Sequence, residues 1–247
     1  MKFVRGGLQM TTIRDCIAPD RNPKVPSIKL PEGSIDTHVH IFESQYPLFE
    51  GRGYNPPDST LDDLKHLHSQ LGVSRVVYTQ PSPYGVDNSA ILKGMKVMND
   101  ETPGRARGVC AIKMDVSDDF LEDLDKQGIK GVRLNMDNIG GMPIGLDEIP
   151  TLEARIKDLG WHVEYLFPGK DIVELAPIFK KSSVPISIAH FAYQPATNGI
   201  NSEGFKTLLD LVRDGNTWIK ISGANRVSET DLPPYDDVMP MARALIE

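Results

Sequence analysis

Short apolar runs alternate with longer amphipathic segments along most of the chain. Runs rich in β-branched and apolar residues predict strands at 35–40, 75–79, 108–112, 131–134, 162–166, 185–189 and 217–221. Apolar residues with helical spacing predict helices at 60–71, 88–99, 118–127, 150–159, 170–180, 202–213 and 236–246. This alternation indicates a parallel sheet, because parallel neighbours need a crossover of about a dozen residues.

Local signals mark several of the predicted boundaries. Ser59 or Thr60 stands before an acidic pair, and Ser117 stands before another, which are typical helix starts. Gly72 and Gly128 follow helices and precede strands, where a left-handed residue ends a helix. Seven to eight such units favour an α/β fold of the TIM-type (β/α)8 barrel over a doubly wound sheet.

The 247 residues divide unevenly. Residues 1–33 contain Gly6-Gly7 and several prolines without periodicity, which predicts an N-terminal arm, and 34–247 form one predicted barrel domain. At roughly 30 residues per unit, that domain holds seven βα units, so the eighth is expected to be missing at the C-terminus. The unpaired edges of the first and seventh strands would favour a homo-oligomer. The Pro/Gly-rich stretch 42–59 is expected to form a lid or wall over the first strand.

Composition excludes several classes of function. Apolar residues at 40% and charged residues at 25% are ordinary globular values, and the net charge of −7 argues against nucleic acid or an acidic membrane as partner. Two cysteines form no disulfide framework or zinc motif, which indicates a reducing compartment. No apolar run reaches about 20 residues, and residues 1–15 lack the apolar region of a secretory signal. A cytoplasmic location is therefore expected.

The segment Ile35-Asp36-Thr37-His38-Val39-His40 is the sharpest chemical signal. Residues two apart in a strand share a face, so His38 and His40 are expected side by side at the carboxyl end of the first strand, where barrel active sites lie. Two imidazoles in that geometry can bind one metal ion or one substrate carbonyl oxygen. His190 stands at the end of the sixth predicted strand, directly after Ala189, and is expected to join them.

The other histidines are assigned structural or surface positions. His162 opens its strand and is expected in the core near the opposite end of the barrel. His66 and His68 lie in a polar helix, which predicts a solvated face.

Further polar residues lie near the ends of the predicted strands or follow them. Arg133 and Arg226 are candidate carboxylate-binding residues, because the guanidinium offers a planar fork of donors, although a surface salt bridge is the alternative for each. Lys113 is a third candidate cation. Asn88 is expected to be a helix cap or part of the site wall. Tyr165 faces either the site or a surrounding helix, and Glu164, its neighbour in the strand, faces the opposite side.

Six segments together resemble the amidohydrolase superfamily, and within it the 2-pyrone-4,6-dicarboxylate lactonase group. They are DTHVHIF at 36–42, YGVDN at 84–88, RARGV at 105–109, GVRLN at 131–135, LGWHV at 159–163 and VMPMAR at 238–243. The resemblance implies hydrolysis of a small carboxylated lactone, a step typical of aromatic degradation, without a divalent metal. By match, His38, His40 and His190 would polarise the lactone carbonyl, and Arg133 and Arg226 would hold the substrate, with Tyr165, Lys113 and Asn88 as further contacts.

The sequence departs from that group in three places. The group has an arginine shortly after the sixth-strand histidine, where this chain reads Phe191-Ala192-Tyr193, and its strand-5 tyrosine is displaced by one position. The strand-8 aspartate that activates water in the group has no counterpart before Glu247. Two alternatives therefore stay open: a metal-dependent hydrolase or decarboxylase with zinc or manganese on His38, His40 and His190, and a truncated, catalytically silent homologue.

Overall fold

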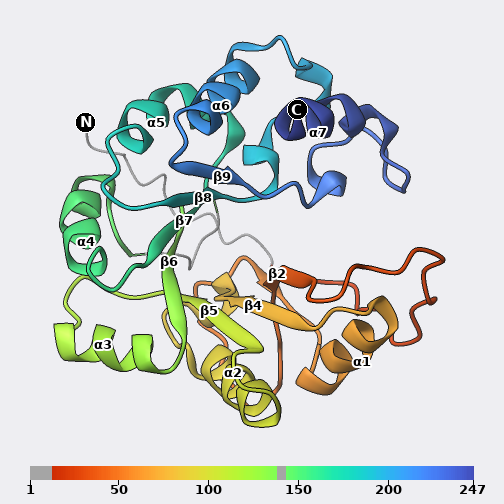
Figure 1. Cartoon of the computed structure of the whole chain (residues 1–247), viewed down its shortest axis with the longest axis vertical. Coiled ribbons are helices and arrows are strands. Elements are labelled where there is room, and N and C mark those ends of the chain that lie inside the picture. Colours follow the sequence, from red (N-terminus) through yellow and green to blue (C-terminus); the bar gives the residue numbers. More distant parts are fainter. Residues whose placement is uncertain (1–12, 138–142) are drawn as a thin grey trace.

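The computed structural model of the chain describes residues 13–137 and 143–247, and its centre is a curled parallel sheet (Figure 1). Each strand pairs in parallel with the next, in the order β2-β4-β5-β6-β7-β8-β9. The bounds of the strands are β2 (Ile35–Val39), β4 (Arg75–Thr79), β5 (Ala106–Cys110), β6 (Ile129–Asn135), β7 (His162–Leu166), β8 (Ile186–Ile188) and β9 (Thr217–Ile219). The predicted TIM-type α/β fold is thus confirmed as seven strands of a barrel in the described residues.

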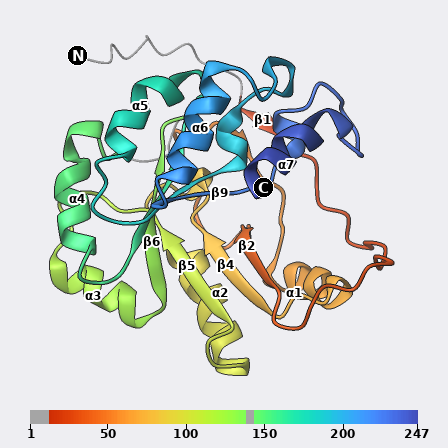
Figure 2. The ribbon, with the colours of Figure 1, turned by 45° about the horizontal axis from the view of Figure 1, so that its top comes forward.

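Helices cover the outer face of the curled sheet, as Figures 1 and 2 show. They are α1 (Leu61–Leu71), α2 (Ser89–Glu101), α3 (Asp118–Lys126), α4 (Ile149–Ile156), α5 (Ile172–Phe179), α6 (Glu203–Arg213) and α7 (Met239–Ile246). Short 3-10 turns lie at Ser82–Tyr84 (η1), Leu146–Glu148 (η2), Gly169–Asp171 (η3), His190–Tyr193 (η4), Ala196–Asn198 (η5), Ala224–Arg226 (η6) and Asp236–Val238 (η7). All seven predicted helices are confirmed, with ends shifted by a few residues.

The predicted helix ends have the expected chemistry. The Thr60 hydroxyl accepts a hydrogen bond from the Asp63 amide, and the Asp63 carboxylate accepts one from the Thr60 amide, which closes a capping box before α1. Gly72 ends α1 with φ 76°, a left-handed conformation that glycine adopts without steric cost. Ser117 caps α3 by accepting from the Phe120 amide. These caps fix where each crossover begins and ends.

The apolar core lies largely between the sheet and the helices. Tyr78 and Trp161 are fully buried, and Met95 of α2 packs beside Gly108 of β5. Gly131 of β6 admits the ring of His162, whose Nδ1 donates to the Lys130 carbonyl 2.8 Å away. His162 is therefore hydrogen-bonded, as predicted, but half-buried at the start of β7 and not part of the core.

The N-terminal arm and the stretch 42–59 form one wall beside the sheet. β1 (Arg14–Asp15) pairs in parallel with β3 (Tyr54–Asn55), and an antiparallel bridge between Phe42 and Ser59 closes the base of the stretch. Residues 1–12 of the predicted arm, including Gly6-Gly7, lie outside the described residues. The wall brings Tyr54 toward the carboxyl ends of the strands.

Among the described residues, the two outer strands of the sheet are β2 and β9. A side chain links them: Nζ of Lys220, just after β9, donates to the Thr37 carbonyl of β2 at 3.1 Å. The curl of the sheet therefore brings its first and last strands within reach of one lysine side chain.

In the described ranges, no helix combines the length and the apolar composition that crossing a bilayer requires.

Candidate active site

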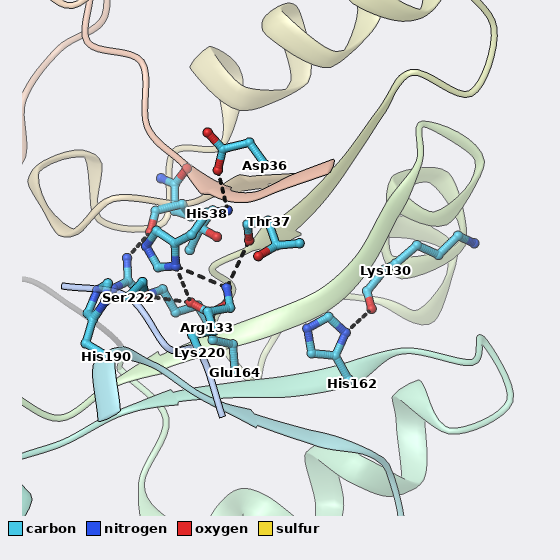
Figure 3. A network of polar contacts seen from close by, with 12 residues as sticks. Asp36, Thr37, His38, Lys130, Arg133, His162, Glu164, His190, Lys220 and Ser222 are labelled. Carbon is cyan, nitrogen blue, oxygen red and sulfur yellow. Dashed lines mark hydrogen bonds and ion pairs between the residues drawn. The ribbon is translucent and has the colours of Figure 1, made fainter. Parts of the chain in front are cut away.

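The first two histidines of the site owe their direction to an irregularity in β2. Asp36 pairs with Val76 of β4, but Val39 pairs with Tyr78, so β2 contains one extra residue between these pairs. This bulge lets Asp36 point outward while His38 points inward (Figure 3), and the ring of His40 lies beside that of His38. The rings of His38 and His40 lie with centroids 4.9 Å apart, which confirms that they stand side by side.

The outward Asp36 corrects one sequence prediction. His68 of α1 was expected on a solvated helix face, but it is only 1% exposed and its Nε2 lies 3.2 Å from the Asp36 carboxylate. The helical pattern could not show this, because the partner is on a strand 32 residues earlier. His66, on the same helix, is exposed as predicted.

His190 joins the cluster through an unusual turn. Four consecutive residues of η4, from His190 to Tyr193, have φ between 50° and 54°, a left-handed turn without glycine. Such a conformation costs roughly 1–2 kcal/mol per residue for L-amino acids. Hydrogen bonds from the Ala192 amide to the Ala189 carbonyl and from the Phe191 amide to the Lys220 carbonyl, both 3.0 Å, help to hold it.

This turn brings two rings to the site. The His190 ring has its centroid 5.0 Å from that of His38, and the Tyr193 ring stacks on His190 at 6.0 Å and 17°. Gly169 makes the turn possible, because a Cβ at that position would overlap the carbonyl oxygen of Tyr193. His38, His40 and His190 are thus brought together from β2 and the end of β8, as the sequence predicts.

Charged groups lie against the three rings. The Arg133 guanidinium of β6 is 4% exposed, donates to the Gln80 carbonyl at 2.9 Å and lies 3.6 Å from Oε1 of Glu164. Glu164 of β7 is fully buried, and its other oxygen accepts from Nζ of Lys220. The same Nζ lies 3.0 Å from Nδ1 of His38.

Burial and these cations keep the histidines neutral. Burial is the largest cause that lowers the pKa of His40, to about 3, and Arg133 adds to it. Burial and then Arg226 lower the pKa of His190 to about 4. Burial, with His40 and Lys220, holds the pKa of His38 well below its ordinary value. For Glu164, burial alone would raise the pKa, but Lys220 and Arg133 outweigh it and keep the carboxyl ionised.

The hydrogen-bond partners define which ring nitrogen of His40 carries the proton. Its Nδ1 lies 2.8 Å from the Thr79 carbonyl, which can only accept, so Nδ1 donates and Nε2 of the neutral ring presents a lone pair. His190 places Nδ1 3.0 Å from the Ser222 hydroxyl, which donates or accepts. The histidines of the cluster are therefore held in distinct environments.

Arg226 lies at the exposed side of the cluster. Its guanidinium donates to the Tyr193 hydroxyl at 3.2 Å and lies 5.8 Å from the centre of that ring, a cation–π contact. Tyr193 occupies the region in which the sequence departs from the lactonase group. A phenol held by an arginine therefore stands beside His190.

Three other predicted contact residues lie elsewhere. Tyr165 is fully buried with its ring centroid 4.7 Å from that of Phe179 in α5, so it faces the helices and Glu164 faces the site. The Asn88 amide exchanges hydrogen bonds with Ala111 and holds the end of β5 in place. Lys113 is exposed after β5 and shows no contact with the three rings in the described ranges.

Several residues of the site were missed by sequence reasoning, namely Lys220, Tyr193, Ser222 and Tyr54. Lys220 lies near the end of the predicted strand 217–221 and Ser222 directly follows it, the kind of position that singled out Arg133 and His190, so that signal could have found them. The position of Tyr193 depends on the left-handed turn, and the position of Tyr54 depends on the wall formed by the arm and the stretch 42–59. Burial in that wall raises the pKa of the Tyr54 phenol, and Ser82 and Arg133 oppose that rise.

The donor set does not fit a resident metal ion. The described part of the chain holds no group of three His, Cys, Asp or Glu side chains arranged for one. Nε2 of His40 could act as a ligand, but the Lys220 ammonium at Nδ1 of His38 opposes a second cation on that ring. The predicted alternative of zinc or manganese on His38, His40 and His190 therefore lacks support from the geometry of this site.

Comparison with known proteins agrees with the fold. The sequence profile of the amidohydrolase family matches residues 35–247. A 2-pyrone-4,6-dicarboxylate hydrolase of Comamonas testosteroni is 34% identical over 236 residues, covering 92% of this chain and 76% of that protein. A 4-sulfomuconolactone hydrolase of Hydrogenophaga intermedia is 32% identical over 235 residues, covering 94% and 76%.

A solved structure has a similar fold. It is described as a probable 2-pyrone-4,6-dicarboxylic acid hydrolase from Acinetobacter baumannii with citric acid bound, and it matches with a TM-score of 0.73 and 28% identity over 86% of this chain and 77% of that one. The chain therefore belongs to the amidohydrolase family.

Proposed function

We propose that the chain is a hydrolase that opens a small lactone bearing a carboxylate. Relatives at 34% and 32% identity are named as hydrolases of 2-pyrone-4,6-dicarboxylate and 4-sulfomuconolactone, both anionic cyclic esters. Water attacks the ring carbonyl carbon and gives up one proton, a tetrahedral oxyanion forms, the ring C–O bond breaks, and the leaving oxygen takes up one proton. The new carboxylic acid then releases the second proton of the water. The product is one ring-opened molecule that carries the new carboxylate and an alcohol or enol group.

One observation carries this proposal: the cluster has an excess of positive charge in a chain whose net charge is −7. Three cations, Arg133, Arg226 and Lys220, and the buried carboxylate of Glu164 act on His190, and the histidines are neutral. Arg133 and Lys220 pair with Glu164, whereas Arg226 contacts Tyr193. A second carboxylate, Asp137, lies near enough to act on Tyr193, where its charge and burial both raise the pKa of the phenol. Three cations against two carboxylates still leave the cluster positive. Such a site favours an anionic substrate over a neutral one.

The position of each residue in the site determines its proposed role. Arg226, at the exposed side, and Arg133, deeper in the site, bind substrate carboxylate through their forked donors. Imidazole N–H groups beside them stabilise the oxyanion, which grows in charge only as water adds. The Nε2 lone pair of His40 accepts a hydrogen bond from the attacking water and orients it.

This mechanism uses no metal ion. We propose a metal-independent reaction because neutral imidazole donors and fixed cations supply the charge stabilisation that a metal would otherwise provide. The metal-dependent alternative would need a set of at least three side-chain ligands, and the described residues hold no such group arranged for a metal ion.

A panel of lactones tests the proposed function. Pyrone and muconolactone derivatives with and without a carboxylate are incubated with the purified chain, and ring opening is followed by the loss of ultraviolet absorbance or by proton release. Carboxylated lactones should be opened well above the rate in buffer, and neutral analogues much more slowly. A panel turned over no faster than in buffer would reject the proposal in favour of a catalytically silent homologue.

A further inference from the structure

Lys220 connects the last strand of the sheet to the histidine cluster. Its backbone is fixed at both ends, since its amide donates to the Ile188 carbonyl at 2.9 Å and its carbonyl accepts from the Phe191 amide at 3.0 Å. Its side chain then crosses to β2, where Nζ reaches the Thr37 carbonyl, Nδ1 of His38 and Oε2 of Glu164 (Figure 3). The side chain is 13% exposed, so water screens these contacts little.

The proton count of this group decides the state of His38. An ammonium has three N–H donors and no lone pair, and the Thr37 carbonyl and the Glu164 carboxylate can only accept. Nδ1 of His38 must therefore accept as well, and the proton of the neutral ring lies on Nε2. That Nε2 is buried and has no hydrogen-bond partner among the described residues.

Glu164 shows what would happen without the lysine. Its Oε1 lies 3.6 Å from Nδ1 of His38. A carboxylate facing Nδ1 would hold the proton there, and Nε2 would then present a lone pair, as it does in His40. The lysine and the carboxylate therefore favour opposite tautomers of one ring, and the ammonium is the closer of the two.

We propose that Lys220 is a positioning residue that fixes His38 as the Nε2–H tautomer and so gives the site its oxyanion donor. The adjacent His40 is held as the Nδ1–H tautomer by Thr79, which makes the neighbouring rings a donor and an acceptor. A single strand thereby supplies one group for the carbonyl oxygen and one for the water. The catalytic part of this inference rests on the proposed function, whereas the tautomer does not.

Nitrogen-15 NMR of the histidine rings measures the tautomer directly. In the wild-type chain without substrate, the His38 signals, assigned by their absence in His38→Ala, should show a protonated Nε2 and an unprotonated Nδ1. In Lys220→Met the proton should move to Nδ1, opposite Glu164. Lys220→Arg, which keeps the cation, should keep it on Nε2, and Lys220→Met/Glu164→Gln should lose the preference for Nδ1.

Kinetics on an accepted lactone give the second readout. Lys220→Met should lower kcat by about 10²-fold, the usual effect of losing one oxyanion donor, with little change in KM. Lys220→Arg should recover much of that loss. Lys206→Met, which removes an exposed lysine on α6, should behave as the wild type.

Two results would overturn the inference. One is a wild-type His38 with its proton on Nδ1, which needs no folded variant to be observed. The other is a Lys220→Met chain that keeps both the Nε2 proton and its kcat. If the tautomer responds as expected while no lactone is opened, the proposed function fails and the assignment of Lys220 stands.

Discussion

Nζ of Lys220 lies 3.0 Å from Nδ1 of His38, although 182 positions of the chain separate the two residues. The contact joins the two outermost strands of an open sheet through an active-site histidine. Folding of the last unit and the tautomer of a histidine in the first are therefore linked. The curl of the sheet, which runs from β2 round to β9 in Figure 1, explains why a residue near the end of the chain acts on one near its start.

Replacing His38 by alanine should reduce turnover without much effect on substrate binding. The ring donates to a charge that exists only as water adds to the carbonyl, so kcat should fall by about 10²–10³-fold while KM changes little. Steady-state kinetics on a carboxylated lactone measure both. His66→Ala, on the exposed face of α1, is the matched control and should leave them unchanged, and an equal loss in both variants would contradict the role of His38.

Arg226→Met should weaken binding of the carboxylate. A hydrogen bond to a charged group contributes about 1.5–3 kcal/mol, so KM should rise by about ten- to a hundredfold, with a smaller change in kcat. For a neutral lactone that is opened slowly, the KM should not rise in this variant. Arg243→Met removes an exposed arginine of α7 and serves as control. A KM that rises equally for neutral and carboxylated lactones would exclude the proposed contact.

Stability should fall as the pH is lowered from 7 toward 4. In the unfolded chain the histidines bind a proton near pH 6.5, whereas the folded chain holds His40 neutral down to about 3 and His190 to about 4. The unfolded state thus binds more protons in this window, and stability rises with pH. Urea unfolding at several pH values checks this, and His40→Gln should flatten the slope relative to His66→Gln.

Gly169→Ala should destabilise the chain and lower its activity. The added Cβ must displace the carbonyl of Tyr193, so the left-handed turn and His190 shift; overpacking of this kind costs about 1–3 kcal/mol. Thermal unfolding and kcat report the two effects. Gly53→Ala adds a methyl group where nothing lies within 4 Å and is the control. Equal unfolding temperatures for both variants would contradict the close approach.

Chelation should leave the activity intact. Protein purified without added metal should contain far less than one equivalent of zinc or manganese by mass spectrometry, and treatment with a chelator should not change kcat. About one equivalent of tightly bound metal, with activity lost on its removal, would instead support the metal-dependent alternative on His38, His40 and His190.

Most of the fold could be predicted from the sequence because each βα unit carries its own local signals. Thr60, Ser117 and Gly72 mark helix ends through hydrogen bonds within a few residues. The His38 and His40 pair was equally accessible, since alternation in a strand is local. What these signals omit is the bulge that turns Asp36 away from the two histidines.

The rest of the site depends on contacts between distant segments. Tyr165 and Glu164 were ambiguous because a barrel strand has one face toward helices and one toward the interior, and here the charged residue faces inward, where Lys220 and Arg133 neutralise it. His68 was misassigned because its carboxylate partner lies on another element. Tyr193 could not be placed because no local pattern predicts four left-handed residues without glycine.

The close approach of Gly169 to the η4 turn has a practical meaning for changing the substrate range. The two segments come from consecutive βα units, yet the shape of one is permitted by the missing side chain of the other. In a relative that has a bulkier residue at the position of Gly169, a library that randomises 190–193 would sample a different backbone conformation of this turn. Grafted loops will therefore keep their specificity only when both segments are transferred together.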